Sequence, residues 1–144
     1  IPTPAQVAHA ERAFYAFCHF TVDTFTDREW GTGGESESVF NPSAFDASQI
    51  VSAIKASTAK GVILTCKHHD GFCLWPTSTT PHSVKNSPFR GGKGDVVREF
   101  ADACKSQGMD FGVYVSPWDR NHPSYGTPDY IPVYREQINE LTTK

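Results

Sequence analysis

Residues 62–72 read Val62-Ile63-Leu64-Thr65-Cys66-Lys67-His68-His69-Asp70-Gly71-Phe72. The apolar, partly β-branched first half is typical of a buried strand, and the polar second half of a turn that ends it. In parallel α/β sheets, the residues just past the carboxyl end of a strand form the binding face. Two adjacent imidazoles at that position donate and accept hydrogen bonds with little charge, which suits a ligand rich in hydroxyl groups.

Two more strands are expected around this one, at residues 14–20 and 110–116, and helical patterns alternate with them. The βαβαβα order predicts a parallel sheet with right-handed crossovers. Long loops after each strand, and the lack of a Gly-rich phosphate loop after the first, favour a barrel over a dinucleotide fold. A full barrel needs about 250 residues. We therefore expect an α/β fold: the N-terminal three βα units of a TIM-like (β/α)8 barrel, incomplete in this chain.

Helix boundaries are indicated by capping residues. Asp46 is the expected N-cap of the first helix and Gly61 its C-cap, while Asp95 and Gly108 bound the second helix. A last helix is expected over residues 130–143.

Composition excludes some partners. The net charge is −3 and the pI is about 6.0, with no basic run, so we expect no nucleic acid partner. No apolar stretch approaches the roughly 20 residues of a membrane span, so we expect no membrane partner. The cysteines form no CxxC pair and are expected to be buried free thiols: Cys18, Cys66, Cys73 and Cys104.

The histidine pair has a metal-binding alternative. Ligands at adjacent positions do not usually converge on one ion, and no HxH or HxxxH spacing occurs, so no metal is expected at His68 and His69. Asp70-Gly71 is interpreted as the turn that follows the strand. His82 and His122 are expected in surface loops.

Other candidates for ligand contact lie at or after the flanking strands. Glu29-Trp30, in the long loop 21–43, places a carboxylate beside an indole, which fits sugar binding, although an exposed Glu beside a core Trp fits equally well. His19 ends the first strand, where a structural role is the more common one. Tyr114 alternates with Val113 and Val115 and should face the barrel axis if the valines face the helices. Asp119 and Arg120 in the following loop are close enough in sequence to form an ion pair.

Several segments together resemble one family. They are Phe17-Cys18-His19-Phe20, Glu29-Trp30-Gly31-Thr32-Gly33, Phe40-Asn41-Pro42, residues 67–76 (KHHDGFCLWP), Gly94-Asp95-Val96-Val97 and residues 114–120 (YVSPWDR). In these segments the chain resembles the N-terminal part of the catalytic barrel of glycoside hydrolase family 29, the α-L-fucosidases. The EWGTG and SPWDR forms are most similar to the branch associated with α-1,3/1,4-linked fucose. Thr21 departs from the family pattern, which usually has Gly there.

The resemblance implies a fucose pocket formed by six residues: His19, Glu29, Trp30, His68, His69 and Tyr114. The methyl group of fucose needs an apolar wall, which we expect from Trp30, Phe72 and Trp75. It also implies no cofactor, a fucosylated oligosaccharide or glycoconjugate as substrate, and a secreted or extracellular location, although the chain itself shows no signal-peptide pattern.

The resemblance further implies a retaining exo-glycosidase that forms a covalent fucosyl-enzyme intermediate. In the family the nucleophile is an Asp at the end of the fourth barrel strand, and this chain reaches only Lys144. Residues 1–144 are thus expected to be the N-terminal portion of the catalytic barrel, with no catalytic carboxylate in this chain. The remainder would be a second chain or a missing segment of the same enzyme. The alternatives are a non-catalytic, lectin-like fucose-binding fragment and, on His68 and His69 alone, a metal-dependent hydrolase.

Overall fold

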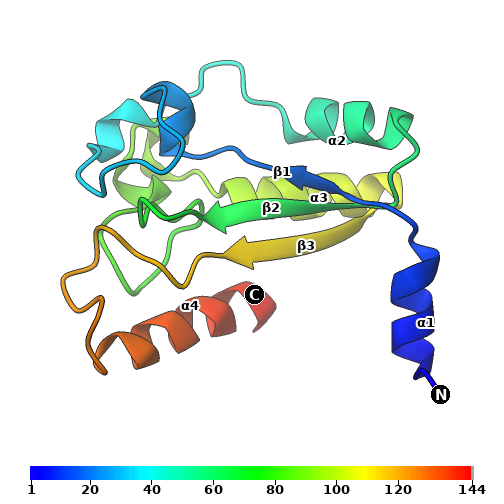
Figure 1. The fold of residues 1–144 in the computed structure, drawn as a ribbon. Helices are drawn as coiled ribbons and strands as arrows, with labels where there is room; N and C mark the ends of the chain where they lie inside the picture. The colour runs from blue at the N-terminus through cyan, green and yellow to red at the C-terminus, as the bar shows by residue number, and fades with distance from the viewer. Residues whose placement is uncertain (144) are drawn as a thin grey trace.

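A three-stranded parallel sheet forms the centre of the computed structural model, which describes residues 1–143 (Figure 1). Strands β1 (Ala16–Cys18), β2 (Gly61–Lys67) and β3 (Asp110–Val115) lie in the order β1-β2-β3. The three arrowheads point the same way, so the segments that follow the strands gather at one edge of the sheet. The α/β class and the parallel sheet are as expected; Lys144 lies outside the described residues.

Alternate side chains of the central strand β2 point to opposite faces of the sheet. Val62, Leu64 and Cys66 are at most 1% exposed and belong to the apolar core. The opposite face carries Ile63 and Thr65, which pair in register with Phe17 and Tyr114 respectively. Paired residues of adjacent strands share a face. Tyr114 therefore lies on the face opposite the core, as the sequence predicts.

In the described part of the chain, four α-helices accompany the sheet: α1 (Pro4–Glu11), α2 (Ala47–Ala56), α3 (Val96–Gln107) and α4 (Tyr130–Thr143). Short 3-10 turns lie at η1 (Val22–Phe25), η2 (Glu37–Val39), η3 (Val84–Asn86) and η4 (Phe89–Gly92). Buried residues of α2 and α3 join those of β2 in the core. No helix among the described residues is long and apolar enough to cross a membrane.

The predicted helix starts are confirmed at the level of single hydrogen bonds. The Asp46 carboxylate accepts from the backbone N–H of Gln49 at 3.0 Å, and that of Asp95 from the N–H of Arg98 at 2.9 Å. Gly108 ends α3 with φ +67°, a left-handed conformation that favours glycine. The expected range of the last helix, 130–143, is also confirmed.

Three details differ from the sequence-based expectation. The first strand has only residues 16–18 instead of 14–20, because the flanking residues do not pair with β2: Phe14 is exposed, and Phe20 packs against the core outside the sheet. Gly61 is not a helix C-cap: α2 ends at Ala56, and Gly61 opens β2 where a Cβ would lie 3.0 Å from that of Asp110. Helix α1 was not predicted, although Thr3, Pro4 and Gln6 form a capping box with proline at the first turn.

The cysteines are free thiols, as expected. Cys66, Cys73 and Cys104 are buried in the core, and Cys18 is half-buried beside it. Burial raises the pKa of the Cys104 thiol to about 11, so this group stays protonated and unreactive at neutral pH.

Candidate functional site

Four of the predicted site residues form a cluster of rings at the carboxyl ends of the strands. His19 follows β1, His68 and His69 follow β2, and Tyr114 lies near the end of β3. The centroid of the His68 ring is 5.7 Å from that of His19, 4.2 Å from that of His69 and 6.3 Å from that of Tyr114. Three parallel strands thus bring together residues that are far apart in the sequence.

Two tryptophans extend this cluster on the His69 side. The Trp30 and Trp118 ring centroids are 6.2 and 4.8 Å from that of His69 and 6.0 Å from each other. Trp30 is 49% exposed, so much of its ring is free to meet a ligand. Trp118 was not among the predicted site residues. Its place directly after the third strand, the same placement that singled out His68, is the sequence signal that points to it.

A cavity of about 450 Å³ opens beside His19 and His68. Its lining comes almost entirely from the loop after β1 and includes Glu29, whose side chain is exposed. The further lining residues are Thr21, Asp23, Thr24, Asp27 and Arg28. The structure therefore places all six predicted residues in one region: three at this cavity and three in the adjoining ring cluster.

A hydrogen bond fixes the orientation of His69. Its Nδ1 lies 2.7 Å from Ser116 Oγ, and the same hydroxyl group lies 2.8 Å from the Trp118 carbonyl oxygen, which can only accept. Because the hydroxyl has one proton, both contacts are satisfied when Ser116 donates to the carbonyl and His69 Nδ1–H donates to Ser116. His69 Nε2 is then left as an acceptor for a ligand hydroxyl group.

Both adjacent histidines are neutral near pH 7. Desolvation, followed by the charges of His69 and His19, lowers the pKa of His68 to about 4. Desolvation and the Arg120 guanidinium lower the pKa of His69. The site thus presents uncharged imidazoles, which bind hydroxyl groups without attracting a counter-ion.

The loops after β1 and β3 are joined by hydrogen bonds from side chains of one loop to backbone carbonyl oxygens of the other. Arg120 Nη1 donates to the Gly31 carbonyl oxygen and Asn121 Nδ2 donates to the Gly33 carbonyl oxygen, both at 2.7 Å. Gly33 has φ +83°, and a Cβ there would collide with the Arg120 backbone. Arg120 therefore holds the loop of Glu29 and Trp30, and does not form the ion pair with Asp119 that the sequence left open.

Asp119 instead pairs with Lys67 in the protein interior. Lys67 Nζ is completely buried and donates to Asp119 Oδ2 at 3.1 Å, Tyr130 Oη at 2.6 Å and Gln137 Oε1 at 2.8 Å. The hydroxyl group of Tyr130 donates to the same carboxylate at 2.9 Å. All three ammonium protons have partners, so this network joins the end of β2 to the loop after β3 and to α4.

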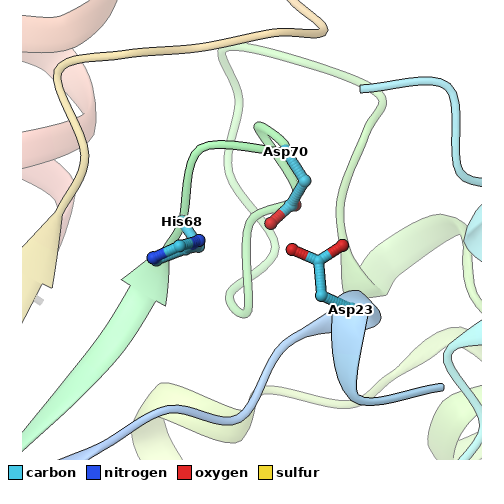
Figure 2. Close-up of side chains that lie close together, drawn as sticks. All are labelled: Asp23, His68 and Asp70. Carbon is cyan, nitrogen blue, oxygen red and sulfur yellow. The ribbon is translucent and has the colours of Figure 1, made fainter. Parts of the chain in front are cut away.

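A second buried carboxylate lies in the turn between His69 and Phe72. Gly71 has φ +86°, which confirms the predicted turn, but the Asp70 side chain is fully buried and faces Asp23 of η1 (Figure 2). Potential ligand atoms of Asp23, His68 and Asp70 all lie within 4.8 Å of one another. Sequence reasoning missed this arrangement, because 47 positions separate the two aspartates.

Three expectations about neighbouring residues are wrong. Phe72 and Trp75 do not form an apolar wall: Phe72 is fully buried in the core, and Trp75 is buried with its Nε1 donating to Glu140 Oε2 at 2.7 Å. Trp118 occupies the corresponding place beside Trp30. His82 is not a surface residue, since it is 1% exposed with Nδ1 2.7 Å from Glu37 Oε1.

The chain was compared with sequence models of protein families and with known proteins, and both comparisons indicate the same family. The sequence model of the family described as Alpha-L-fucosidase matches residues 5–142. The chain belongs to the α-L-fucosidase family. It is 49% identical over its whole length to Alpha-L-fucosidase 1 of Arabidopsis thaliana, of which it covers 29%.

Solved structures of family members have the same fold. A glycoside hydrolase 29 family member from an unknown rumen bacterium matches all of this chain with a TM-score of 0.99 and 51% identity, and the match covers 26% of that protein. A Ruminococcus gnavus GH29 fucosidase in complex with fucose matches 97% of this chain with a TM-score of 0.89 and 38% identity, over 32% of its own length. The chain therefore spans about a quarter to a third of these relatives of the α-L-fucosidase family.

Proposed function

We propose that this chain is the N-terminal portion of the catalytic barrel of a retaining exo-α-L-fucosidase and supplies part of its fucose pocket. The observation that carries this proposal is the convergence of His19, His68, His69 and Tyr114 at the carboxyl ends of three parallel strands, in a chain of the α-L-fucosidase family. Ligands of parallel barrels bind at this end.

The chemistry of the site fits a deoxy sugar. The neutral imidazoles and Glu29 offer hydrogen-bond partners for sugar hydroxyl groups, while Trp30 and Trp118 offer an apolar surface for the methyl group and the C–H face of the ring. No cofactor or metal has a part in this scheme. The two carboxylates of a retaining mechanism would come from the part of the enzyme that this chain does not contain.

The exposed apolar positions on the sheet support the completion of a barrel. Phe17 on β1 is 46% exposed and Val113 on β3 is 36% exposed, and these strands form the two edges of the sheet. Unpaired edges with exposed apolar side chains favour association with further strands. Five further βα units would cover them in a (β/α)8 barrel, and the greater length of the relatives leaves room for those units.

The test is hydrolysis by the full-length gene product, using an aryl α-L-fucoside first. Release of fucose with retained anomeric configuration supports the proposal, whereas fucose binding in calorimetry without hydrolysis would establish the lectin-like alternative. Comparison of branched Lewis-type glycans with α-1,2-linked fucosides then tests the proposed α-1,3/1,4 specificity. Faster hydrolysis of the α-1,2 linkage would overturn that specificity alone.

A further inference from the structure

The carboxyl groups of Asp23 and Asp70 face each other inside the protein, beside His68 (Figure 2). Asp23 is 5% exposed and Asp70 is 0% exposed. Asp70 Oδ1 accepts the backbone N–H of Phe72 at 2.6 Å. The other three oxygens, Asp23 Oδ1 and Oδ2 and Asp70 Oδ2, are buried and meet no N–H or O–H donor of the described residues.

Two ionised carboxylates cannot remain in such a place. Both would be desolvated with one hydrogen bond between them, that from Phe72 to Asp70, and the two negative charges would repel. A single shared proton removes the repulsion and gives two of the three oxygens a partner, because one group becomes an O–H donor and the other a charged acceptor. Burial and the charge of Asp23 raise the pKa of Asp70 to about 8, and burial also raises the pKa of Asp23. The two groups therefore titrate as a pair.

The surrounding charges do not replace this proton. Arg28 and Arg120 favour the ionised form of Asp23, and Glu35 opposes it. None of them makes a hydrogen bond to the Asp23 carboxylate: the Arg28 backbone N–H donates to the Asp23 carbonyl oxygen at 3.4 Å, and Arg120 Nη1 donates to the Gly31 carbonyl oxygen at 2.7 Å. On the Asp70 side the titratable neighbours are His68, which is neutral near pH 7, and the buried thiol of Cys73.

A proton also fits the space better than a metal ion. Among the His, Cys, Asp and Glu side chains of the described residues, those of Asp23, His68 and Asp70 approach the place, so a divalent cation would need water or a ligand to complete its coordination. Gly31 closes the site on one side: a Cβ there would lie 2.8 Å from Asp70 Cβ and even closer to Asp23 Oδ1. The backbone is thus packed directly against the pair.

We propose that Asp23 and Asp70 are positioning residues that share one proton and so hold the loop after β1 against the turn after β2. Asp23 lies in the loop that carries Glu29 and Trp30, and Asp70 directly follows His68 and His69. The shared hydrogen bond fixes these two halves of the sugar site relative to each other. The effect on catalysis rests on the proposed function, whereas the shared proton itself does not.

The test compares wild-type full-length protein with Asp23→Asn, in which the amide N–H replaces the shared proton at every pH. Asp102→Asn, which removes an exposed carboxylate on α3, is the matched control. Melting temperature is measured from about pH 5 to 9.5. A raised folded-state pKa gives stability that is lost as pH rises from the ordinary aspartate value through about 8. His68 has the opposite effect below about pH 6.5, so the comparison is made above that pH. There wild type and Asp102→Asn should lose stability as pH rises, and Asp23→Asn should lose clearly less.

A second measurement, kcat/KM on an aryl fucoside, reports the positioning role. With a pKa of about 8, the protonated fraction falls roughly tenfold between pH 7 and 9. The ratio of kcat/KM of Asp23→Asn to that of wild type should therefore rise roughly tenfold over the same range. Failure of wild type to hydrolyse any fucoside would refute the proposed function, while the melting curves would still decide the shared proton.

Three outcomes would overturn the shared proton. One is parallel loss of stability in wild type and Asp23→Asn. Another is a wild-type melting temperature that rises with millimolar MnCl2 or ZnCl2 and falls with chelator, which would indicate a cation. If Asp23→Asn does not fold, Asp70→Asn makes the same exchange from the other side. Misfolding of both asparagine variants is the third outcome, because an amide should satisfy the pair.

Discussion

His69 Nδ1 lies 2.7 Å from Ser116 Oγ, across 47 positions of sequence, and this contact links the turn after β2 to the residue that follows β3. Ser116 is completely buried and also accepts the backbone N–H of Trp118 at 3.1 Å. The serine therefore holds both the imidazole and the indole that lines the site beside it.

Removal of the His69 imidazole should reduce catalysis without unfolding the protein. A buried neutral hydrogen-bond partner contributes on the order of 1–3 kcal/mol, so His69→Ala should lower kcat/KM roughly ten- to a hundredfold. Steady-state kinetics on an aryl fucoside and a circular dichroism melt provide the measurement. The control is His9→Ala, because His9 is exposed on α1. Unchanged kcat/KM in both His68→Ala and His69→Ala would exclude the pocket proposed here.

Loss of the Ser116 hydroxyl group should lower kcat/KM less than loss of the His69 imidazole does. Ser116→Ala removes the acceptor for His69 Nδ1–H and frees the ring to take the other tautomer. One hydrogen bond contributes about 1 kcal/mol, so kcat/KM should fall roughly fivefold. The double variant His69→Ala, Ser116→Ala should lose less than the sum of the two single losses, since the part of the serine's effect that acts through the histidine is already gone and only its contacts with Trp118 remain. Additive losses would contradict that role.

The exposed indole of Trp30 should contribute to substrate binding. Trp30→Ala removes an aromatic surface that is 49% exposed beside His69 and Trp118, and aromatic contacts of this kind contribute about 0.5–1.5 kcal/mol. KM should rise roughly two- to tenfold. Tyr15→Ala, which truncates an exposed ring far from the site, should leave KM unchanged. An equal change of KM in both variants would show that Trp30 does not contact the substrate.

The Lys67–Asp119 pair should be important for stability. Lys67→Met leaves the Asp119 carboxylate buried without its cation, and breaking a buried pair costs about 3–5 kcal/mol. Urea denaturation of the full-length protein measures this loss. Arg12→Ala disrupts the exposed ion pair with Asp110, where the side chains are 41% and 60% exposed, and should cost less than about 1 kcal/mol. Similar costs for the two variants would show that the buried network is dispensable.

The neutral state of His68 should make the protein sensitive to acid. Its pKa is lowered to about 4 in the folded state, so below the ordinary histidine pKa the unfolded chain binds a proton that the folded chain does not. Stability is then lost as pH falls from about 6.5 toward 4. His68→Asn should lose less stability over this interval, and His9→Asn should behave as wild type. Parallel melting curves for His68→Asn and wild type would contradict the assigned pKa shift.

Local chemistry determined the parts of the fold that sequence reasoning predicted. The helix starts at Asp46 and Asp95 and the stop at Gly108 depend on groups within three residues of each cap. Strand β2 follows from a continuous apolar run. The first strand was predicted too long because apolar character alone does not reveal pairing: Phe14 and Phe20 are apolar but lie outside the three residues that pair with β2.

By itself the sequence determined which residues end the strands and which chemistry they bring. His68 and His69 were predicted from their place at a strand end, and the family resemblance added His19 and Tyr114 to the predicted site. Only the tertiary structure decided their partners. Ser116 for His69, Asp119 for Lys67 and Asp23 for Asp70 lie 47 or more positions away in sequence. Such pairs depend on how three loops pack around Gly31, Gly33 and Gly71, where close backbone approach leaves no room for a side chain. No local pattern encodes that packing, because it arises only once the strands are in register.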